Sequence, residues 1–332
     1  MEIKRKAIKL RPPMLAYQMG VDGDIIEFPK KRRQAWSWTE FRLGQAEHVK
    51  QVVDELNEYW PLTLRQVYYR LLGVMIKENT SSRYQDLSKL ITAMRQDGLL
   101  PWEAVEDRTR NLSQKRGFSD KETFVKQELD NLFEGYDRCY VQDQENYVEI
   151  WVEKDALSHI IEKASWRYCV RVLTGRGYQS TTVQKNFADR ARRAIDIGHI
   201  PVVLYFGDYD PSGINILESA IQNIHDKYKL PDVTFIRVAL TLDQIHGYDL
   251  PLVPLKSGDK RLKDYLQRYG GVAAELDALH PQILRNLTTK ALNSLFDLEN
   301  MNEHVGIEHL EREELAQNKQ EILDYYTSML KR

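Results

Sequence analysis

Cysteine and long apolar runs are scarce in this 332-residue sequence. Cys139 and Cys169 are its only cysteines, which argues against a disulfide framework or a thiolate metal cluster. The eight histidines show no His-x-x-x-His spacing of the kind that zinc sites use. No apolar run is long enough to span a bilayer, and the first residues lack the apolar core of a signal peptide. We therefore expect a cytoplasmic protein without membrane contact.

A strand-like apolar run, residues 201–206, leads into two carboxylates. Asp208 and Asp210 follow it, in a turn closed by Pro211 and Gly213. Side chains two residues apart in extended backbone point the same way, so both aspartates can face one divalent cation. Asp, Pro and Gly also make up ordinary turns. The run alone therefore leaves the choice between a metal site and a plain turn open.

A third carboxylate, Glu153, ends another strand-like run, residues 147–154. Between the acidic positions lie a strand-like segment, 168–173, and an amphipathic helix, 182–195. This alternation predicts an α/β fold with a mainly parallel sheet flanked by helices, and ligands at the carboxyl ends of the strands. Glu153 and the two aspartates are expected to converge there. Their hard oxygen ligands suit Mg²⁺, with Mn²⁺ as an alternative.

A Glu after the first strand and an Asp-x-Asp after a later one resemble the Toprim domain, a metal-binding module of topoisomerases, primases and several nucleases. Within that superfamily, Asp208–Gly213 followed by Ile-Asn-Ile is most similar to the A subunit of topoisomerase VI and its relative, the meiotic double-strand-break transesterase. Three later segments resemble the tail of short stand-alone A-subunit-like proteins from bacteria, viruses and mobile elements: 238–245, 250–256 and 275–281.

The resemblance implies a catalytic tyrosine on a winged-helix domain upstream. Residues 63–73 resemble the family's Arg-x-x-aromatic-Tyr motif, which assigns the nucleophile to Tyr69 and the arginine to Arg65. Helical periodicity independently places Tyr68 on the apolar face and Tyr69 off it, beside Arg65. A guanidinium there favours the phenolate and can grip a phosphate. We therefore expect Tyr69 to be exposed, although an edge tyrosine of an amphipathic helix is the alternative.

Pattern changes predict three parts: a basic N-terminal arm (1–45), a winged-helix-like domain that carries the tyrosine (46–135) and a Toprim-like metal-binding domain (136–332). Residues 1–50 hold 11 Lys and Arg against 6 Asp and Glu, whereas residues 297–314 hold seven acids and one arginine. This asymmetry suits one nucleic-acid face, although a charge run is often only solvated surface. The candidate DNA contacts are Arg108, Arg110, Arg176, Lys256 and Arg261.

We expect Mg²⁺-dependent cleavage of double-stranded DNA, in which Tyr69 attacks a phosphodiester and leaves a 5′-phosphotyrosyl link. In the family, the tyrosine of one protomer works with the metal of the other, so the resemblance implies a homodimer, here associated with the nucleoid. Strand passage would need a separate ATPase subunit, because the sequence has no Gly-x-x-x-x-Gly-Lys-Ser/Thr loop.

Two alternatives stay open. The first is a Toprim nuclease that hydrolyses DNA with a metal-activated water, with Tyr69 as a bystander. The second is a DNA-binding subunit without activity, which Gln66 keeps open because relatives often carry an acid at that position.

Overall fold

The computed structural model describes residues 16–19, 25–28, 36–105, 117–175 and 180–330. The chain divides into two compact units, residues 1–43 and 44–332. In the first unit, β1 (Ala16–Met19) and β2 (Ile25–Phe28) pair antiparallel. The sequence pattern predicted only an irregular arm there, because four-residue strands are too short to show a clear alternation.

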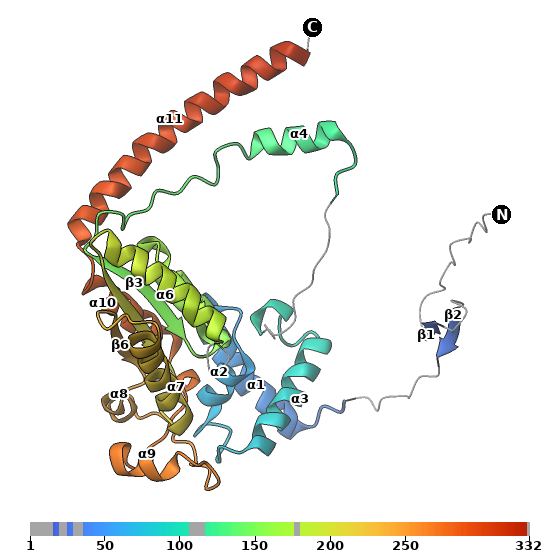
Figure 1. Ribbon diagram of the computed structural model, residues 1–332. Helices are drawn as coiled ribbons and strands as arrows, with labels where there is room; N and C mark the ends of the chain where they lie inside the picture. Colours follow the sequence, from blue (N-terminus) through green and yellow to red (C-terminus); the bar gives the residue numbers. More distant parts are fainter. Residues whose placement is uncertain (1–15, 20–24, 29–35, 106–116, 176–179, 331–332) are drawn as a thin grey trace, which may run out of the picture. The chain divides into compact units, whose positions relative to one another are not determined.

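Helices make up most of the second unit (Figure 1). They are α1 (Glu40–Glu55, which begins in the first unit), α2 (Leu64–Leu71), α3 (Ser81–Gln96), α4 (Lys121–Asp130), α5 (Ser158–Ser165), α6 (Thr181–Asp196), α7 (Pro211–Gln222), α8 (Leu242–Gly247), α9 (Leu262–Tyr269), α10 (Pro281–Asn293) and α11 (Leu298–Leu330). The strands are β3 (Asn146–Val152), β4 (Arg171–Thr174), β5 (Ile200–Phe206) and β6 (Thr234–Ala239).

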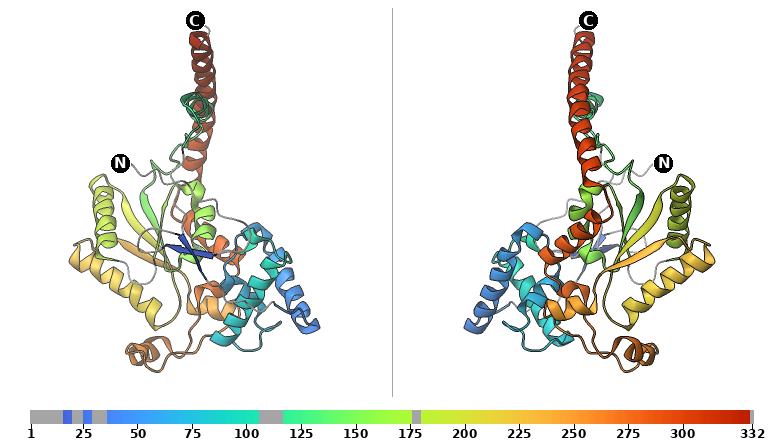
Figure 2. Two further views of the ribbon diagram at one scale, coloured as in Figure 1. Left: turned by 90° about the vertical axis from the view of Figure 1, so that its right-hand side faces the viewer. Right: turned by 90° about the vertical axis from the view of Figure 1, so that its left-hand side faces the viewer.

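The four strands form one parallel sheet in the order β4-β3-β5-β6, which confirms the predicted α/β class. Helices cover both faces of the sheet, with α6 and α7 on one side and α5 and α10 on the other (Figure 2). Because both faces are covered, the central strands β3 and β5 read as nearly continuous apolar runs. Val152 lies opposite Phe206 in the register, so β3 and β5 end at the same level.

The core between the sheet and helices α6 and α7 is built around aromatic side chains. Trp151 of β3 and Phe187 of α6 meet edge to face, with ring centroids 4.9 Å apart, and both are almost fully buried. Val203 and Tyr205 of β5 join the same cluster. Alternate residues of the two strands therefore anchor the helices that flank the candidate site.

Two expected elements have different bounds. The expected strand at 168–173 begins only at Arg171, because Trp166–Tyr168 form a 3-10 turn and Cys169 adopts a left-handed φ of 50°. The expected helix at 63–77 ends at Leu71, because Gly73 turns the chain with a φ of 81° that glycine adopts without strain. The expected boundary between a winged-helix-like and a Toprim-like domain near residue 135 stays a prediction.

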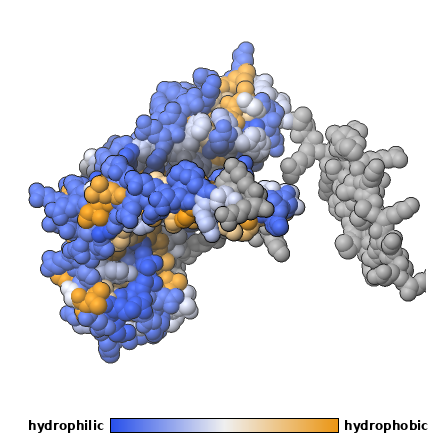
Figure 3. Space-filling model, turned by 90° about the horizontal axis from the view of Figure 1, so that it is seen from above, coloured by the Kyte–Doolittle hydropathy of each residue, from blue (hydrophilic) through white to orange (hydrophobic). Residues whose placement is uncertain are grey.

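The surface seen in Figure 3 is mainly hydrophilic, with hydrophobic side chains in small separate groups. Among the residues that the structure describes, none of the helices combines the length and the apolar composition needed to cross a membrane.

The buried aromatic pair gives a stability prediction. Phe187→Ala removes a side chain with no exposed surface, so it should lower the free energy of unfolding by about 3 to 5 kcal/mol in urea denaturation. Trp166→Ala is the matched control, because Trp166 is 76% exposed and its loss should cost less than about 0.5 kcal/mol. Equal losses in the two variants would contradict the assigned core.

Candidate functional site

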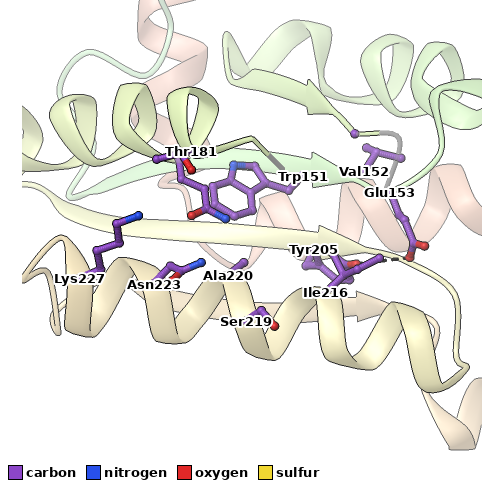
Figure 4. A pocket seen from close by; sticks show the side chains of 12 residues that line it. Trp151, Val152, Glu153, Thr181, Tyr205, Ile216, Ser219, Ala220, Asn223 and Lys227 are labelled. Carbon is purple, nitrogen blue, oxygen red and sulfur yellow. Dashed lines mark hydrogen bonds between the residues drawn. The ribbon is translucent and has the colours of Figure 1, made fainter. Parts of the chain in front are cut away.

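The carboxylate of Glu153 lies where β3 and β5 end. The strand pairing continues one step beyond β3, since the Glu153 amide donates to the carbonyl of Phe206 at 2.8 Å. The Asp208 amide donates to Glu153 Oε2 at 3.0 Å, and the hydroxyl of Tyr205 donates to the same oxygen at 3.4 Å (Figure 4). The parallel sheet thus makes Glu153 and Asp208 neighbours.

Two glycines leave room for this carboxylate. A Cβ on Gly207 would lie 2.7 Å from Glu153 Oε2, and a Cβ on Gly213 would overlap the carbonyl of Asp208 and lie 3.1 Å from the same Oε2. Real Cβ atoms do not approach oxygen so closely, so both positions require glycine. The sequence motif pointed to Gly213 as a turn residue. Gly207 carried no separate signal.

Lys154 joins the strand end to a second group of acids. Its Nζ lies 2.9 Å from Asp208 Oδ1, 2.7 Å from Asp277 Oδ2 and 3.1 Å from Glu275 Oε2. The amide of Leu276 donates to Asp208 Oδ1 at 2.8 Å. Glu275 precedes the 3-10 turn Leu276–Ala278 and Asp277 lies within it, and the sequence pattern indicated no role for either.

The network raises the pKa of some of its carboxylates and lowers that of another. Burial raises the pKa of Asp208, and the charge of Glu153 adds to the shift against the opposing effect of Lys154. Burial also raises the pKa of Glu153. Burial opposes ionisation of Glu275 as well, but Lys154 and Arg65 outweigh it and lower the pKa below its ordinary value. Glu275 is therefore the carboxylate best held in its charged form.

Helix α2 brings the predicted nucleophile to this network. Thr63 caps the helix by accepting from the amide of Gln66, whose side chain accepts from the Thr63 amide in return. Arg65 pairs with Glu275, and Tyr69 lies near enough to the same carboxylate for its charge to raise the pKa of the phenol, beside the larger effect of burial. One chain of side chains therefore runs from Tyr69 through Glu275 and Lys154 to Asp208.

The expected exposure of Tyr69 is wrong. Tyr69 is 6% exposed and Tyr68 is 2% exposed, because α2 is covered by α3 and also by the turn Leu276–Ala278. Periodicity indicates only one apolar face, whereas tertiary packing closes the second. Tyr68 lies in the core as expected, where its hydroxyl donates to the carbonyl of Thr80 at 3.2 Å and accepts from its amide at 3.1 Å.

Burial also changes the state of the Tyr69 phenol. Burial raises its pKa, the charge of Glu275 raises it further, and Lys154 and Arg65 only partly oppose these effects. The arginine that was expected to favour the phenolate is thus outweighed by its surroundings. In this arrangement Tyr69 keeps its proton.

The third expected metal ligand, Asp210, caps helix α7. Its Oδ1 accepts from the amide of Gly213 at 2.7 Å. Over the described residues, no three Asp, Glu, His or Cys side chains group closely enough to hold a metal ion. The donor chemistry still fits a hard divalent cation, because Asp277 Oδ1 is buried without a hydrogen-bond partner and the pKa values of Glu153 and Asp208 are both raised.

Arg237 of β6 supports the turn that carries Asp208, and sequence analysis missed it. Its Nε donates to the carbonyl of Leu240 at 2.6 Å, and its Nη2 donates to the carbonyls of Gly207 and Asp208. The guanidinium also lies over the ring of Tyr205. A single arginine in an apolar strand has no sequence pattern that would reveal this role.

The candidate DNA contacts fall into two groups. Arg108, Arg110 and Arg176 lie outside the described residues. Arg261 holds Asp259 through its Nε and Nη2, each at 2.8 Å from a carboxylate oxygen, whereas Lys256 is exposed.

A cavity of about 110 Å³ adjoins the site between the sheet, α6 and α7. Figure 4 shows Glu153 near one end of the view and Lys227 near the other, with Ser219 and Asn223 of the α7 side between them. The side chain of Glu153 therefore lines this cavity and also borders the acid network.

Comparison with protein-family models, with curated proteins and with solved structures finds no match to the chain.

Lys154 gives a prediction on the stability of the network. Lys154→Met leaves the carboxylates of Asp208 and Glu275 without their shared cation, so unfolding in urea at neutral pH should become easier by about 3 kcal/mol. Removing the cation raises the Asp208 pKa further above its unfolded value, so the variant loses stability as pH rises and approaches the wild type in acid.

The matched control for this variant is Lys89→Met, because the Lys89 side chain is 65% exposed. That change should cost less than about 0.5 kcal/mol at any pH. A Lys154→Met deficit that did not depend on pH would show that the carboxylates do not depend on Lys154.

Proposed function

We propose that the chain is a Mg²⁺-dependent DNA-cleaving enzyme that acts by tyrosine transesterification, as its resemblance to the topoisomerase VI A subunit implies. One observation carries the proposal: Tyr69 is an electrostatic neighbour of Glu275, which Lys154 joins to Asp208. A tyrosine hydroxyl and the carboxylates of a strand-end acid site therefore belong to one connected network. An amphipathic helix with an incidental tyrosine has no reason to make this connection.

Glu275 is the proposed general base. Its pKa is lowered by Lys154 and Arg65 despite burial, and it neighbours Tyr69, so it can take the proton as the phenol oxygen attacks the phosphorus atom. The new phosphotyrosyl bond forms as the bond to the leaving sugar oxygen breaks. Glu275 thus supplies the carboxylate that the family often carries at the position of Gln66.

Arg65 is the proposed phosphate ligand. It is paired with Glu275 before reaction, and proton uptake by Glu275 would remove the negative charge that holds it. The guanidinium could then grip the scissile phosphate through two donors. Proton transfer and phosphate stabilisation would in this way be linked through a single carboxylate.

Glu153, Asp208 and Asp210 are the proposed holders of Mg²⁺. When bound, the ion would supply positive charge to the phosphate oxygens as negative charge develops there. Asp210 would contribute while its Oδ1 caps α7, or after releasing that cap. Lys154 holds Asp208 in place from the opposite side.

We propose double-stranded DNA as the substrate, a homodimer as the working form and a separate ATPase subunit for any strand passage. The resemblance implies that the tyrosine of one protomer works with the metal of the other. The two protomers of a dimer would then cut the two strands. A nucleoid-associated location follows from this substrate.

Hydrolysis is the second candidate function. The low exposure of Tyr69 and its raised pKa favour it, because a metal-activated water needs no phenolate. In that case Tyr69 would be a structural partner of Glu275. The two functions differ in whether the 5′ end of the cut DNA stays attached to protein.

Tyr69→Phe separates these functions. End-labelled DNA is incubated with protein and Mg²⁺, denatured with detergent and examined for protein-linked label before and after protease. We expect the wild type to form a covalent adduct and Tyr69→Phe to form none. Tyr68→Phe is the matched control and should keep the adduct while losing some stability, because the Tyr68 hydroxyl hydrogen bonds to the backbone of Thr80. Cleavage by Tyr69→Phe at the wild-type rate would establish hydrolysis.

Asp208→Asn tests the acid site common to both functions. Losing one ligand charge should slow cleavage by at least about a hundredfold with the fold intact by circular dichroism. The control is Asp264→Asn, since the Asp264 side chain is 67% exposed and lies outside the network. Full cleavage activity of Asp208→Asn would exclude the proposed metal site. If the wild type bound DNA without cleaving it, the chain would be an inactive DNA-binding subunit.

A further inference from the structure

The two cysteines of the chain are neighbours in space. Cys139 lies in the segment between α4 and β3, and Cys169 lies in the turn before β4. Cys169 Sγ donates to the carbonyl of Arg138, the residue before Cys139, at 3.7 Å. Burial raises the pKa of Cys169, and the neighbouring Cys139 thiol adds to the shift. The sulfur of Cys169 thus lies beside the segment that carries Cys139.

Local structure gives no other reason for a cysteine at position 169. Its φ of 50° is left-handed, a conformation that glycine and asparagine adopt more readily than other residues. The backbone at this position therefore does not account for the side chain found there. The nearby Cys139 thiol offers a reason.

Both thiols can be reached from solvent. Cys139 and Cys169 are exposed, and both line a cavity of about 360 Å³. Arg171 and Arg193 line the same cavity. Their positive charge favours a small reagent that carries carboxylates.

We propose that Cys139 and Cys169 form a reversible dithiol–disulfide pair that exchanges with small anionic disulfides. One protein thiolate attacks a sulfur of the small disulfide and expels one thiol, which leaves a mixed disulfide. The second protein thiolate then attacks the protein sulfur of that bond and expels the second small thiol. The protein loses two hydrogens and two electrons, and the small disulfide is reduced to two thiols.

The disulfide would link β4 to the segment around Cys139, which α11 already contacts through ion pairs. Asp137 pairs with Arg312 at 2.7 Å, and Arg138 pairs with Glu311 at 2.8 Å, both residues of α11. A disulfide at Cys139 would hold the same segment to the start of β4. Because it closes a long loop of the unfolded chain, it should raise the melting temperature by a few degrees.

Oxidised glutathione is the probe for this pair. The full chain is equilibrated with mixtures of oxidised and reduced glutathione, quenched with acid, and analysed by intact mass and on a non-reducing gel. We expect a monomer that is lighter by two hydrogens and carries no glutathione. The disulfide should form in the folded protein at a ratio of reduced to oxidised glutathione that is at least about tenfold higher than the ratio at which it forms in the urea-unfolded chain. The reason is that folding holds the two thiols together.

Cys139→Ser and Cys169→Ser are a matched pair of controls. Each should accept one glutathione, show no loss of two hydrogens and lack the rise in melting temperature. Two glutathiones on the folded wild type, a disulfide-linked dimer, or equal midpoints for the folded and unfolded chains would each overturn the proposal.

Discussion

The structure around the candidate site depends on one buried cation. Lys154 directly follows Glu153 at the end of β3 and lies between Asp208, Glu275 and Asp277. Buried carboxylates are costly unless a partner offsets their charge, and Lys154 offsets all three, with Arg65 as a second partner of Glu275. The end of the sheet and the turn before α10 are therefore held in place by the same ammonium group.

The ammonium group of Lys154 also helps to position α2, through Glu275. Glu275 accepts from Lys154 and from Arg65, and it neighbours Tyr69. A helix that carries a candidate nucleophile is thus fixed to the acid site through a single carboxylate. In the proposed function, a phosphate would have to compete with Glu275 for Arg65. The charge of Glu275 therefore matters both for the position of α2 and for the proposed chemistry.

The parts of this arrangement that follow from local pattern could be predicted from the sequence. The apolar runs of β3 and β5 predict parallel strands, and the adjacency of Glu153 and Asp208 follows once the strands share a register. The partners of Lys154 could not be predicted, since Glu275 lies 121 residues away and follows no strand. The burial of Tyr69 was also missed, because periodicity describes one face of α2 and the turn Leu276–Ala278 covers another. The role of Arg237 was missed too, because its acceptors are backbone carbonyls, which every residue has and which no sequence pattern reveals.

The acids of the site are satisfied mainly by donors of the chain itself. The amides of Asp208, Leu276 and Gly213 each bond one of the three predicted ligands, Glu153, Asp208 and Asp210. Gly207 and Gly213 allow these donors to approach. An ion at the proposed site would compete with these three amides and with the Lys154 contact of Asp208. None of these contacts belongs to the apolar core of the sheet, so the proposed exchange of cation, phosphate and product would leave the packing of that core in place.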